Sequence, residues 1–405
     1  MKILQVNKFY YPRRGADKYF LFLEKVLTER GHQVRVFSMK GPNNLDSKDK
    51  NFFSNNVDLH TKNIKDKFKA AKSVIYNLEA KKKFTSLLNE FTPDIIHCHN
   101  IYHQLSPSIL DVARKKNIPV VMHLHDYKLI CPNYKLYTKG KYCKRCLNGN
   151  YFQCTKYRCI DNNLIKSLLA SIEMTIHHKF LKIYEKGVDK FIAPSIFIKN
   201  ICLEAGWDEA KFFILENISP IKVTPVNKLK NYFLYFGALE EEKGIDLAIK
   251  AAARSNKELV IAGSGSYKSE LEKLGKELNA KLKFTGQVQG TELEKLLSEA
   301  LAIIIPSRWP ENMPLAAIEA MSAAKTIIVS DMGGLPELVE NGKTGYIFPT
   351  EDFIKLSSIM ESISCKEAEK IGKEAFLSRQ NKNLDWHYKE LINIYNQVIE
   401  EKNLE

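Results

Sequence analysis

Two carboxylates with helical spacing give the strongest chemical signal in this 405-residue chain. Glu311 follows an apolar run that ends at Pro306, and Glu319 comes eight residues later. Along a helix, that spacing separates the two side chains by about 12 Å. Because a carboxylate accepts hydrogen bonds from vicinal hydroxyls in pairs, one side chain could contact a sugar and the other a ribose. For Glu319 alone, a solvated helical glutamate is the competing interpretation.

The segment between the two carboxylates predicts a helix whose amino end could bind an anion. Pro314 suits the first helical position, where a missing N–H costs nothing. The free N–H groups around this point and the positive end of the helix dipole favour a diphosphate. The residues expected to line this end are Asn312, Met313, Pro314 and Leu315.

Three further turns follow predicted strands in the second half of the chain. Lys243 closes the turn from Phe236 to Gly244, and Arg308 follows the strand that ends at Pro306. Gly263 opens a Gly-Ser-Gly turn, and Val288 follows a Phe-Thr-Gly-Gln segment. Each of these turns also fits an ordinary loop, since glycine marks turns in most folds.

Two histidine pairs end predicted strands in the first half. His97 and His99 close one strand, and His123 and His125 close the next, with Asp126 directly after. Alternation along a strand puts each pair on one face, which a metal ion could use. His-x-His is a short and common pattern, so metal binding is the weaker interpretation.

The Glu311-x7-Glu319 segment, following a strand and Pro-Ser, resembles the signature of family 4 of the retaining glycosyltransferases. That family adopts the GT-B fold, and the resemblance covers nearly the whole chain with the motifs in the family's order. It implies that Glu311 contacts the donor sugar near its anomeric centre and that Glu319 binds the ribose. By the same resemblance, His125 lies against the donor sugar, Lys243 neutralises the donor diphosphate and Val288 contacts the base. The turn at Gly263 is implied to line the base pocket, and Gly333-Gly334-Leu335-Pro336-Glu337 to lie near the donor.

The chain departs from the family pattern at two turns. Ala238 stands where the family has an arginine that neutralises the diphosphate, so either Arg308 or Arg13 and Arg14 compensate, or donor affinity is reduced. In the turn between the first strand and helix, Gly15 matches the second glycine of a Gly-Gly-Ala-Glu motif. Arg14 replaces the first glycine, and Asp17 replaces the glutamate. We place Arg14, Asp17, His97, His99 and Asp126 on the acceptor side, and Gly15 on the donor.

Retaining chemistry requires either a carboxylate nucleophile or a front-face reaction in which the leaving diphosphate accepts the acceptor's proton. The sequence offers no clear nucleophile. The front-face route depends mainly on positioning and on stabilising the phosphate charge, and the motifs here supply both. We therefore favour that route and expect a nucleotide sugar as substrate, with no cofactor or metal required for catalysis.

Alternating strand and helix patterns predict two Rossmann-like α/β domains that face each other across a cleft. Residues 1–217 form the acceptor domain, with a Cys-rich insertion at 131–159, and residues 218–385 form the donor domain. Residues 217–230 read as the linker, and 386–405 as a helix that crosses back to the first domain. Ten strands are predicted, at 2–6, 33–38, 95–97, 120–123, 190–193, 232–236, 258–261, 282–285, 302–305 and 326–329.

The net charge of +14 is concentrated in residues 1–217 and points to an acidic partner for that half. Residues 62–91 read as a basic amphipathic helix, a pattern found on membrane surfaces, although a core-packed helix with a lysine face fits equally well. We expect weak contact with anionic lipid and a glycan or lipid-linked glycan acceptor. With no apolar run of about 18 residues and no signal-peptide core, a cytoplasmic protein that associates peripherally with the cell membrane is expected.

Five of the eight cysteines fall between residues 131 and 159. Cys143, Cys146, Cys154 and Cys159 could form a tetrahedral structural zinc site, although the middle spacing is short for common zinc modules. Free thiols in a loop insertion fit equally well, and disulfides are less expected in a reducing cytosol.

These observations favour a retaining hexosyl-type glycosyltransferase of cell-surface polysaccharide synthesis. The alternatives are a catalytically weak partner subunit that binds nucleotide sugar, which Ala238 and Arg14 suggest, or another GT-B activity such as a phosphorylase or epimerase. A nucleic-acid-binding protein is suggested by charge alone and lacks a reading motif, so no nucleic-acid partner is expected.

Overall fold

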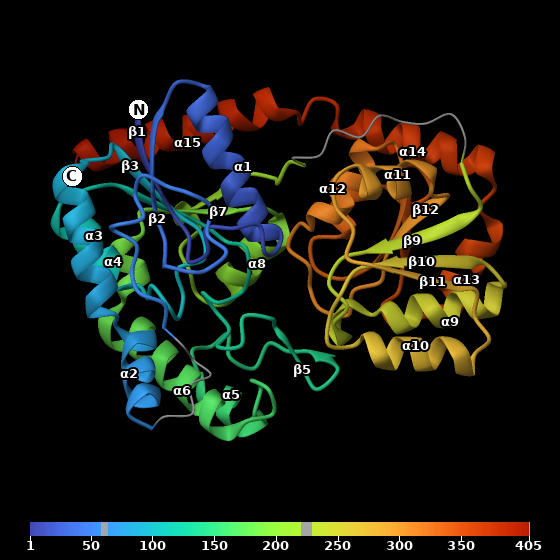
Figure 1. The fold of residues 1–405 in the computed structure, drawn as a ribbon, viewed down its shortest axis with the longest axis horizontal. Helices are drawn as coiled ribbons and strands as arrows, with labels where there is room; N and C mark the ends of the chain where they lie inside the picture. Colours follow the sequence, from blue (N-terminus) through green and yellow to red (C-terminus); the bar gives the residue numbers. More distant parts are fainter. Residues whose placement is uncertain (58–63, 220–228, 405) are drawn as a thin grey trace.

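The computed structural model describes residues 1–57, 64–219 and 229–404 and shows two lobes of parallel sheet covered by helices (Figure 1). Each sheet has six strands, ordered β2-β1-β3-β4-β7-β8 in the first lobe and β11-β10-β9-β12-β13-β14 in the second. All strand pairs within both sheets are parallel. The predicted pair of α/β domains is confirmed.

The first sheet is mostly apolar because helices cover both of its faces, and the polar side chains of its central strands are Lys2, Gln5, His97, His123 and Lys190. Its strands are β1 (Lys2–Val6), β2 (Gln33–Phe37), β3 (Ile95–Cys98), β4 (Val120–His123), β7 (Lys190–Ala193) and β8 (Phe212–Ile214). Its helices are α1 (Gly15–Glu29), α2 (Ile64–Ile75), α3 (Leu78–Glu90), α4 (Ser108–Lys115), α7 (Ile183–Gly187), α8 (Ile196–Glu204) and the 3-10 turn η2 (Glu209–Lys211).

An insertion between β4 and β7 adds a small subdomain at one end of the first lobe. It contains a two-stranded antiparallel ribbon, an α-helical hairpin and a π-helix, with Lys182 in the left-handed region at the end of the π-helix. These elements are β5 (Tyr137–Thr138), β6 (Lys141–Tyr142), α5 (Phe152–Tyr157), α6 (Leu164–Thr175) and η1 (Ile176–Leu181). In Figure 1 β5 extends from the first lobe towards the second.

The second lobe repeats the strand-helix alternation with fully buried central strands. Its strands are β9 (Tyr232–Phe236), β10 (Glu258–Ala262), β11 (Leu282–Gly286), β12 (Ala302–Ile305), β13 (Thr326–Ser330) and β14 (Gly345–Phe348). Its helices are α9 (Ile245–Ser255), α10 (Lys268–Glu277), α11 (Thr291–Glu299), α12 (Leu315–Ser322), α13 (Phe353–Ser362) and α14 (Cys365–Arg379), with 3-10 turns η3 (Glu241–Lys243) and η4 (Pro336–Leu338).

The last helix, α15 (Leu384–Leu404), leaves the second lobe and packs on the first, as predicted (Figure 1). Leu391, Ile394, Tyr395 and Val398 join a core cluster with residues of β1, α1 and β4. The Tyr19 hydroxyl lies 2.8 Å from Nε2 of His387. These buried contacts make the C-terminal helix part of the first lobe's core.

The two segments that pass between the lobes are tied together by one carboxylate. Glu216 follows β8 and accepts ion pairs from Arg379, at 2.9 Å, and from Lys382. Arg379 also donates to the Asn217 carbonyl oxygen. The outgoing and returning segments therefore lie side by side at this point. Most of the predicted linker, residues 220–228, lies outside the described residues.

The predicted basic helix at residues 62–91 is two helices, α2 and α3, and its first two residues lie outside the described ones. Asn77 separates them: its side chain accepts from the Ala80 N–H at 2.9 Å and so caps α3, while its own N–H donates to Ser106. The apolar side of α3 is buried through Ala80, Phe84, Leu87 and Leu88. Within the described ranges, no helix is both long and apolar enough to cross a membrane.

Candidate active site

Glu311 is buried and held by two donors at the end of the loop that follows β12. Its Oε1 atom lies 2.7 Å from Nζ of Lys243 and 2.7 Å from Oγ of Ser307. Lys243 also lies over the Trp309 ring, 4.6 Å from its centroid. The structure thus brings together the predicted carboxylate and the predicted phosphate-binding cation, which come from turns 68 residues apart.

The loop that carries Glu311 is fixed from behind by Gly333 and Gly334. A Cβ on Gly333 would stand 2.3 Å from the Glu311 carbonyl oxygen, and one on Gly334 would stand 2.0 Å from that of Asn312. The Gly334 N–H donates to the Glu311 carbonyl at 2.6 Å. The two glycines are therefore required for close backbone approach, which gives this predicted donor-side motif a supporting role for the position of Glu311.

Helix α12 begins after Pro314 and carries Glu319 on the side that faces α1. Across the lobes, a Cβ on Gly15 would meet the Leu315 side chain at 3.8 Å. Burial raises the pKa of Glu319 to about 7, and Lys18 of α1 opposes the shift. No hydrogen-bond donor to this carboxylate occurs among the described residues. A buried acceptor without a donor, one turn from a helix amino end, suits a hydroxyl-bearing ligand.

The loop after β4 touches the Glu311 loop directly. The Tyr127 hydroxyl donates to the Pro310 carbonyl oxygen at 2.9 Å, and the Asn312 amide donates to the Leu124 carbonyl at 3.2 Å. The Asn217 amide donates to the Met313 carbonyl at 2.9 Å. Predicted site residues from the two halves of the chain thus meet where the lobes contact each other.

The histidines form a buried stack that ends at His125. The ring centroids of His97 and His99 lie 4.3 Å apart, and those of His123 and His125 lie 4.4 Å apart. His99 and His125 are joined by a 2.8 Å contact between Nδ1 and Nε2. Burial lowers the pKa of His125 to about 3, so its imidazole is neutral at pH 7.

His97 does not face an acceptor, because α15 covers that face of β3. Its Nδ1 lies 2.7 Å from the Tyr395 hydroxyl, and the residue is completely buried. The prediction of an acceptor-side His97 therefore lacks support: strand alternation identified the shared face of His97 and His99, but not the helix packed against it. His99 is also buried, and its Nδ1 lies 2.8 Å from Nε2 of His125.

The remaining acceptor-side predictions divide between structural and exposed residues. Asp17 is buried and accepts from the Asn7 amide at 2.9 Å and from the Arg14 N–H at 3.2 Å, so it fixes the turn at Gly15. Arg14 is exposed and pairs with Glu240 of the second lobe at 2.8 Å. Asp126 accepts from the Lys128 N–H at 2.9 Å, and burial raises its pKa.

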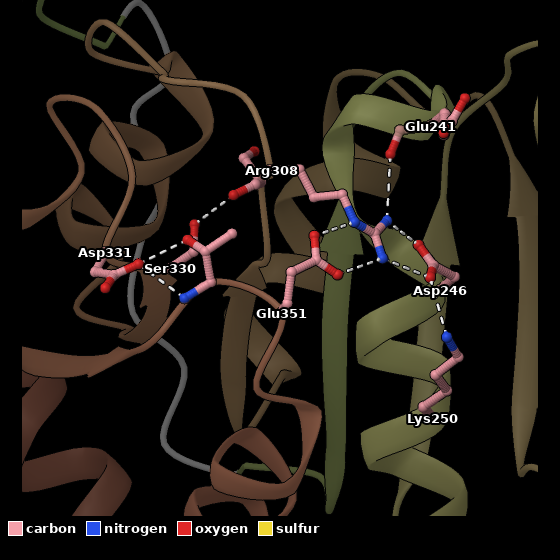
Figure 2. A network of polar contacts seen from close by, with 9 residues as sticks. Glu241, Asp246, Lys250, Arg308, Ser330, Asp331 and Glu351 are labelled. Carbon is pink, nitrogen blue, oxygen red and sulfur yellow. Dashed lines mark hydrogen bonds and ion pairs between the residues drawn. The ribbon is translucent and has the colours of Figure 1, made fainter. Parts of the chain in front are cut away.

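Arg308 is committed to two carboxylates, as Figure 2 shows. Its guanidinium pairs with both oxygens of Asp246 and with Glu351, at 2.6 Å to Oε1. Its charge is therefore neutralised inside the second lobe, and the prediction that it compensates for Ala238 loses its support. Glu351 comes from the segment after β14, which the sequence pattern did not connect to Arg308.

The two other predicted donor-side positions lie near the same edge of the second sheet. A Cβ on Gly263 would stand 1.9 Å from the Gly237 carbonyl oxygen, so this glycine allows the turns after β9 and β10 to touch. Val288 is partly buried against the core beside α11 and α12. Their backbone is thus placed at the strand ends, where ligands bind in parallel sheets.

Five thiols of the insertion, those of Cys131, Cys143, Cys146, Cys154 and Cys159, line one small cavity. All eight cysteines are free. Among the residues that the structure describes, no group of three or more His, Cys, Asp or Glu side chains is arranged to hold a metal ion. The zinc interpretation of Cys143, Cys146, Cys154 and Cys159 has no geometric support here.

Three contacts that position the site were not expected from the sequence. Tyr127 and Ser307 donate to the Glu311 loop, as described above. Glu337 reaches the other lobe, where its carboxylate accepts from the N–H groups of Ile196 and Phe197 at 2.7 and 2.6 Å. A carboxylate at a helix amino end is favourable, but only the folded arrangement shows that α8 is the helix it caps.

Two parallel α/β lobes that meet at their strand ends, with paired carboxylates and a lysine at the contact, define the GT-B class of transferase. Residues 13–218 match the model of Glycosyltransferase Family 4, and residues 219–376 match that of Glycosyl transferases group 1. The chain belongs to Glycosyltransferase Family 4 and is a glycosyltransferase by family.

Among its relatives, an uncharacterized 42.6 kDa protein of the cps region of Klebsiella pneumoniae is 26% identical, over 91% of this chain and 95% of that protein. The lipopolysaccharide 1,2-N-acetylglucosaminetransferase of Salmonella typhimurium is 26% identical over 51% of this chain and 61% of its own. The sucrose-phosphate synthase of Thermosynechococcus elongatus has a similar structure, with TM-score 0.73 and 18% identity over 98% of this chain and 99% of its own. Anabaena HepE, solved with UDP and glucose, gives TM-score 0.69 and 16% identity over 98% and 100%.

Proposed function

We propose that this protein transfers a hexosyl group from a nucleotide sugar to a glycan or lipid-linked glycan, with retention of anomeric configuration, in cell-surface polysaccharide synthesis. The donor binds residues 218–385 and the acceptor binds residues 1–217. The observation that carries the proposal is the convergence of Glu311, Lys243 and the amino end of α12 at the contact with the His125 loop. The cps-region and lipopolysaccharide relatives support a polysaccharide product.

The side chains suit a front-face reaction. Lys243 and the N–H groups at the start of α12 stabilise the departing diphosphate, while Glu319 accepts from the ribose hydroxyls. Glu311 and the neutral His125 position the sugar. The acceptor oxygen bonds to the anomeric carbon on the face from which the diphosphate leaves, the carbon–oxygen bond to phosphate breaks, and the acceptor's proton passes to the diphosphate.

A nucleotide screen followed by turnover of a carboxylate variant tests this function. A ligand that binds only the folded state raises the melting temperature, so UDP, GDP, ADP and their sugars are compared by thermal shift. The donor found in this way is then incubated with the wild type and with Glu311→Gln. We expect sugar release or transfer to fall at least about a hundredfold, the scale of losing a positioned polar contact. Nucleotide binding with no turnover by the wild type would instead identify a partner subunit.

We also propose weak contact with an anionic membrane through the insertion, where α6 and η1 expose an apolar stripe. Ile165 and Phe180 are 77% and 76% exposed, and Leu164, Leu168 and Leu181 are exposed around them. Lys179 and Lys182 flank Phe180 and are exposed as well. Apolar side chains interspersed with lysines suit a negatively charged lipid surface. In α3, by contrast, the apolar face is already buried.

Sedimentation with vesicles tests the membrane contact. Vesicles of phosphatidylcholine with phosphatidylglycerol should co-sediment the protein at low salt, and vesicles of phosphatidylcholine alone should not. The double variant Ile165→Ser with Phe180→Ser should lose this binding, whereas Ile354→Ser, an exposed apolar position of the second lobe, should retain it. Equal sedimentation of the double variant and the wild type would contradict the assignment of this surface.

A further inference from the structure

A cavity of about 440 Å³ lies between the insertion of the first lobe and the second lobe. This volume is within the range of small-molecule sites. Glu241 and Glu242 of η3 form the wall on the second lobe. The insertion supplies the other wall, with Asn133, Tyr134, Lys135, Tyr137, Thr138, Lys139, Arg158, Cys159, Ile160, Asp161 and Asn162.

The wall on the insertion has an unusual backbone. Tyr134, Lys139, Arg158, Asp161 and Asn162 all have φ between 49° and 54°, in the left-handed region. Apart from glycine, only asparagine and aspartate adopt that region with little cost, so Tyr134, Lys139 and Arg158 are held there against their preference. Backbone strain of this kind gathers at sites that bind or react, and these strained residues line a single cavity.

Two cations on this wall have no carboxylate partner. Lys135 pairs with Glu242 across the cavity, and Asp161 pairs with Lys166 at 2.6 Å. The ion pairs of the described chain include neither Lys139 nor Arg158, and both side chains are exposed. In the same wall, hydrogen bonds with Cys154 and Thr138 and the charges of Arg145 and Lys139 together lower the pKa of Cys159 to about 6. On the insertion wall, Lys139 and Arg158 are therefore free to contact an anion, while Glu241 on the facing wall likewise has no ion pair among the described residues.

The cavity adjoins the candidate active site. Glu242 precedes Lys243, whose Nζ atom pairs with Glu311, and the Glu242 carbonyl oxygen accepts from the Arg308 N–H at 2.8 Å. A molecule in the cavity would thus lie next to the turn that holds the donor-side lysine. On the opposite wall, Tyr134 and Asn162 are exposed and offer a ring face and an amide, which suit a sugar.

We propose that this cavity binds the acceptor, and that the acceptor is a glycan bearing a carboxylate or phosphate group that Lys139 and Arg158 contact. The proposal rests on the proposed function for its acceptor role. It assigns the insertion to acceptor selection. Tyr134 and Asn162 contact the neutral sugar, and Lys139 and Arg158 select for the acidic group.

Oligosaccharide binding to the full chain tests the cavity. The probes are a hyaluronan hexasaccharide, a phosphorylated maltohexaose and neutral maltohexaose, each titrated by calorimetry. We expect at least one acidic probe to bind about tenfold or more tightly than the neutral one, and the choice between them identifies the acidic group. Lys139→Gln with Arg158→Gln should remove that preference. Lys156→Gln, an exposed lysine of the same segment outside the cavity, should keep it.

Because both side chains are exposed, we expect the double variant to fold as the wild type does. Circular dichroism and the melting temperature check this. Equal affinity for acidic and neutral probes, or unchanged acidic binding in the folded double variant, would overturn the proposal. The nucleotide screen tests the proposed function independently of the oligosaccharide titrations. A nucleotide shift without oligosaccharide binding overturns only the acceptor site, whereas no nucleotide shift overturns the proposed function and with it the acceptor role.

Discussion

His99 accepts a hydrogen bond from His125 and donates none to it. Nε2 of His99 lies 2.8 Å from the Gln5 side-chain oxygen, which only accepts hydrogen bonds, so the proton of His99 is on Nε2. Nδ1 of His99 is then an acceptor, and Nε2 of His125, 2.8 Å away, carries the proton. This leaves Nδ1 of His125 as an acceptor for a sugar hydroxyl. Gln5 and His99 are positioning residues that set the tautomer of His125.

Replacing His99 should therefore impair turnover more than donor binding. His99→Phe leaves the buried N–H of His125 without its acceptor, at a cost of about 1–3 kcal/mol, and we expect kcat to fall by about tenfold or more. His99→Gln, whose amide oxygen can accept from His125, should recover part of the loss. The check is steady-state kinetics with the nitrogen chemical shifts of His125. Equal kcat for both variants, or a change confined to KM, would argue against tautomer control.

Glu319 should make nucleotide binding and stability depend on pH in opposite ways. Its folded pKa of about 7 lies above the usual 4.5. The folded chain therefore holds this proton more tightly than the unfolded chain does, and stability falls as pH rises from about 4.5 to 7. Above that window, Glu319→Gln should raise the free energy of unfolding by about 3 kcal/mol, with little effect below pH 4.5. Nucleotide affinity of the wild type should instead rise through pH 7, as the ionised carboxylate accepts from the ribose.

Denaturant unfolding at pH 5 and pH 8, with nucleotide titrations at the same pH values, measures both effects. Glu319→Gln should bind nucleotide more weakly than the wild type at pH 8 and show a flat pH profile. A pH-independent stability difference between variant and wild type would contradict the raised pKa.

We expect that removing only one partner of the buried Lys128–Glu173 ion pair strongly lowers the free energy of unfolding. Nζ of Lys128 lies 2.6 Å from Oε2 of Glu173, and both side chains are almost completely buried. Burial alone would raise the pKa of Glu173, but Lys128, His103 and His177 hold it below its usual value. Glu173→Gln leaves a buried charge unpaired and should cost about 3–5 kcal/mol.

The matched control replaces both partners. Lys128→Met combined with Glu173→Met removes both charges and should be far more stable than either single variant, as measured by urea unfolding. Additive losses in the double variant would show that the two charges are independent. The backbone N–H of Lys128 also donates to Asp126. If the double variant is stable but inactive, the ion pair also positions the His125-Asp126 loop.

Two glycines with similar backbone conformation allow the effect of a clash with neighbouring backbone to be measured apart from the effect of a left-handed φ. Gly333 and Gly342 have φ of 67° and 79°, but only Gly333 has backbone atoms in the path of a Cβ. Gly342→Ala should cost about 1–2 kcal/mol for the left-handed conformation alone. Gly333→Ala should cost more and abolish transfer, because the Glu311 loop must move. Thermal unfolding and turnover of the two variants provide the comparison, and equal effects would remove the proposed support of Glu311.

The sequence predicted the sheets well because their strands are short apolar runs bounded by turns. The strands at Lys2–Val6, Val120–His123 and Tyr232–Phe236 occur with the predicted bounds. The edge strands β8 and β14 were missed, since three- and four-residue runs at a sheet edge carry little periodic signal. Helix α5 was missed because its six residues are too few to show a helical period. Helix α6 was also missed, although its segment Leu164–Thr175 is largely apolar.

The candidate site was predictable where separate motifs each carry a recognisable residue, and not where a side chain is engaged by partners outside the motifs. Glu311 and Lys243 were expected to act together, and they do contact each other. For Arg308 the motif suggested a phosphate ligand, but Asp246 and Glu351 take its charge. For His97 the strand pattern gave the correct face, whereas the covering helix comes from the far end of the chain. Such pairings depend on topology, which local spacing does not encode.

The contact of Glu216 with Arg379 and Lys382 has a mechanical consequence. The polypeptide enters and leaves the second lobe at one shared place, which could therefore serve as a single hinge between the lobes. Contacts between the lobes away from this hinge, such as Tyr127 with Pro310 and Arg14 with Glu240, would then hold the two lobes together. A change of angle between the lobes would break these contacts but would leave the ion pairs of Glu216 in place.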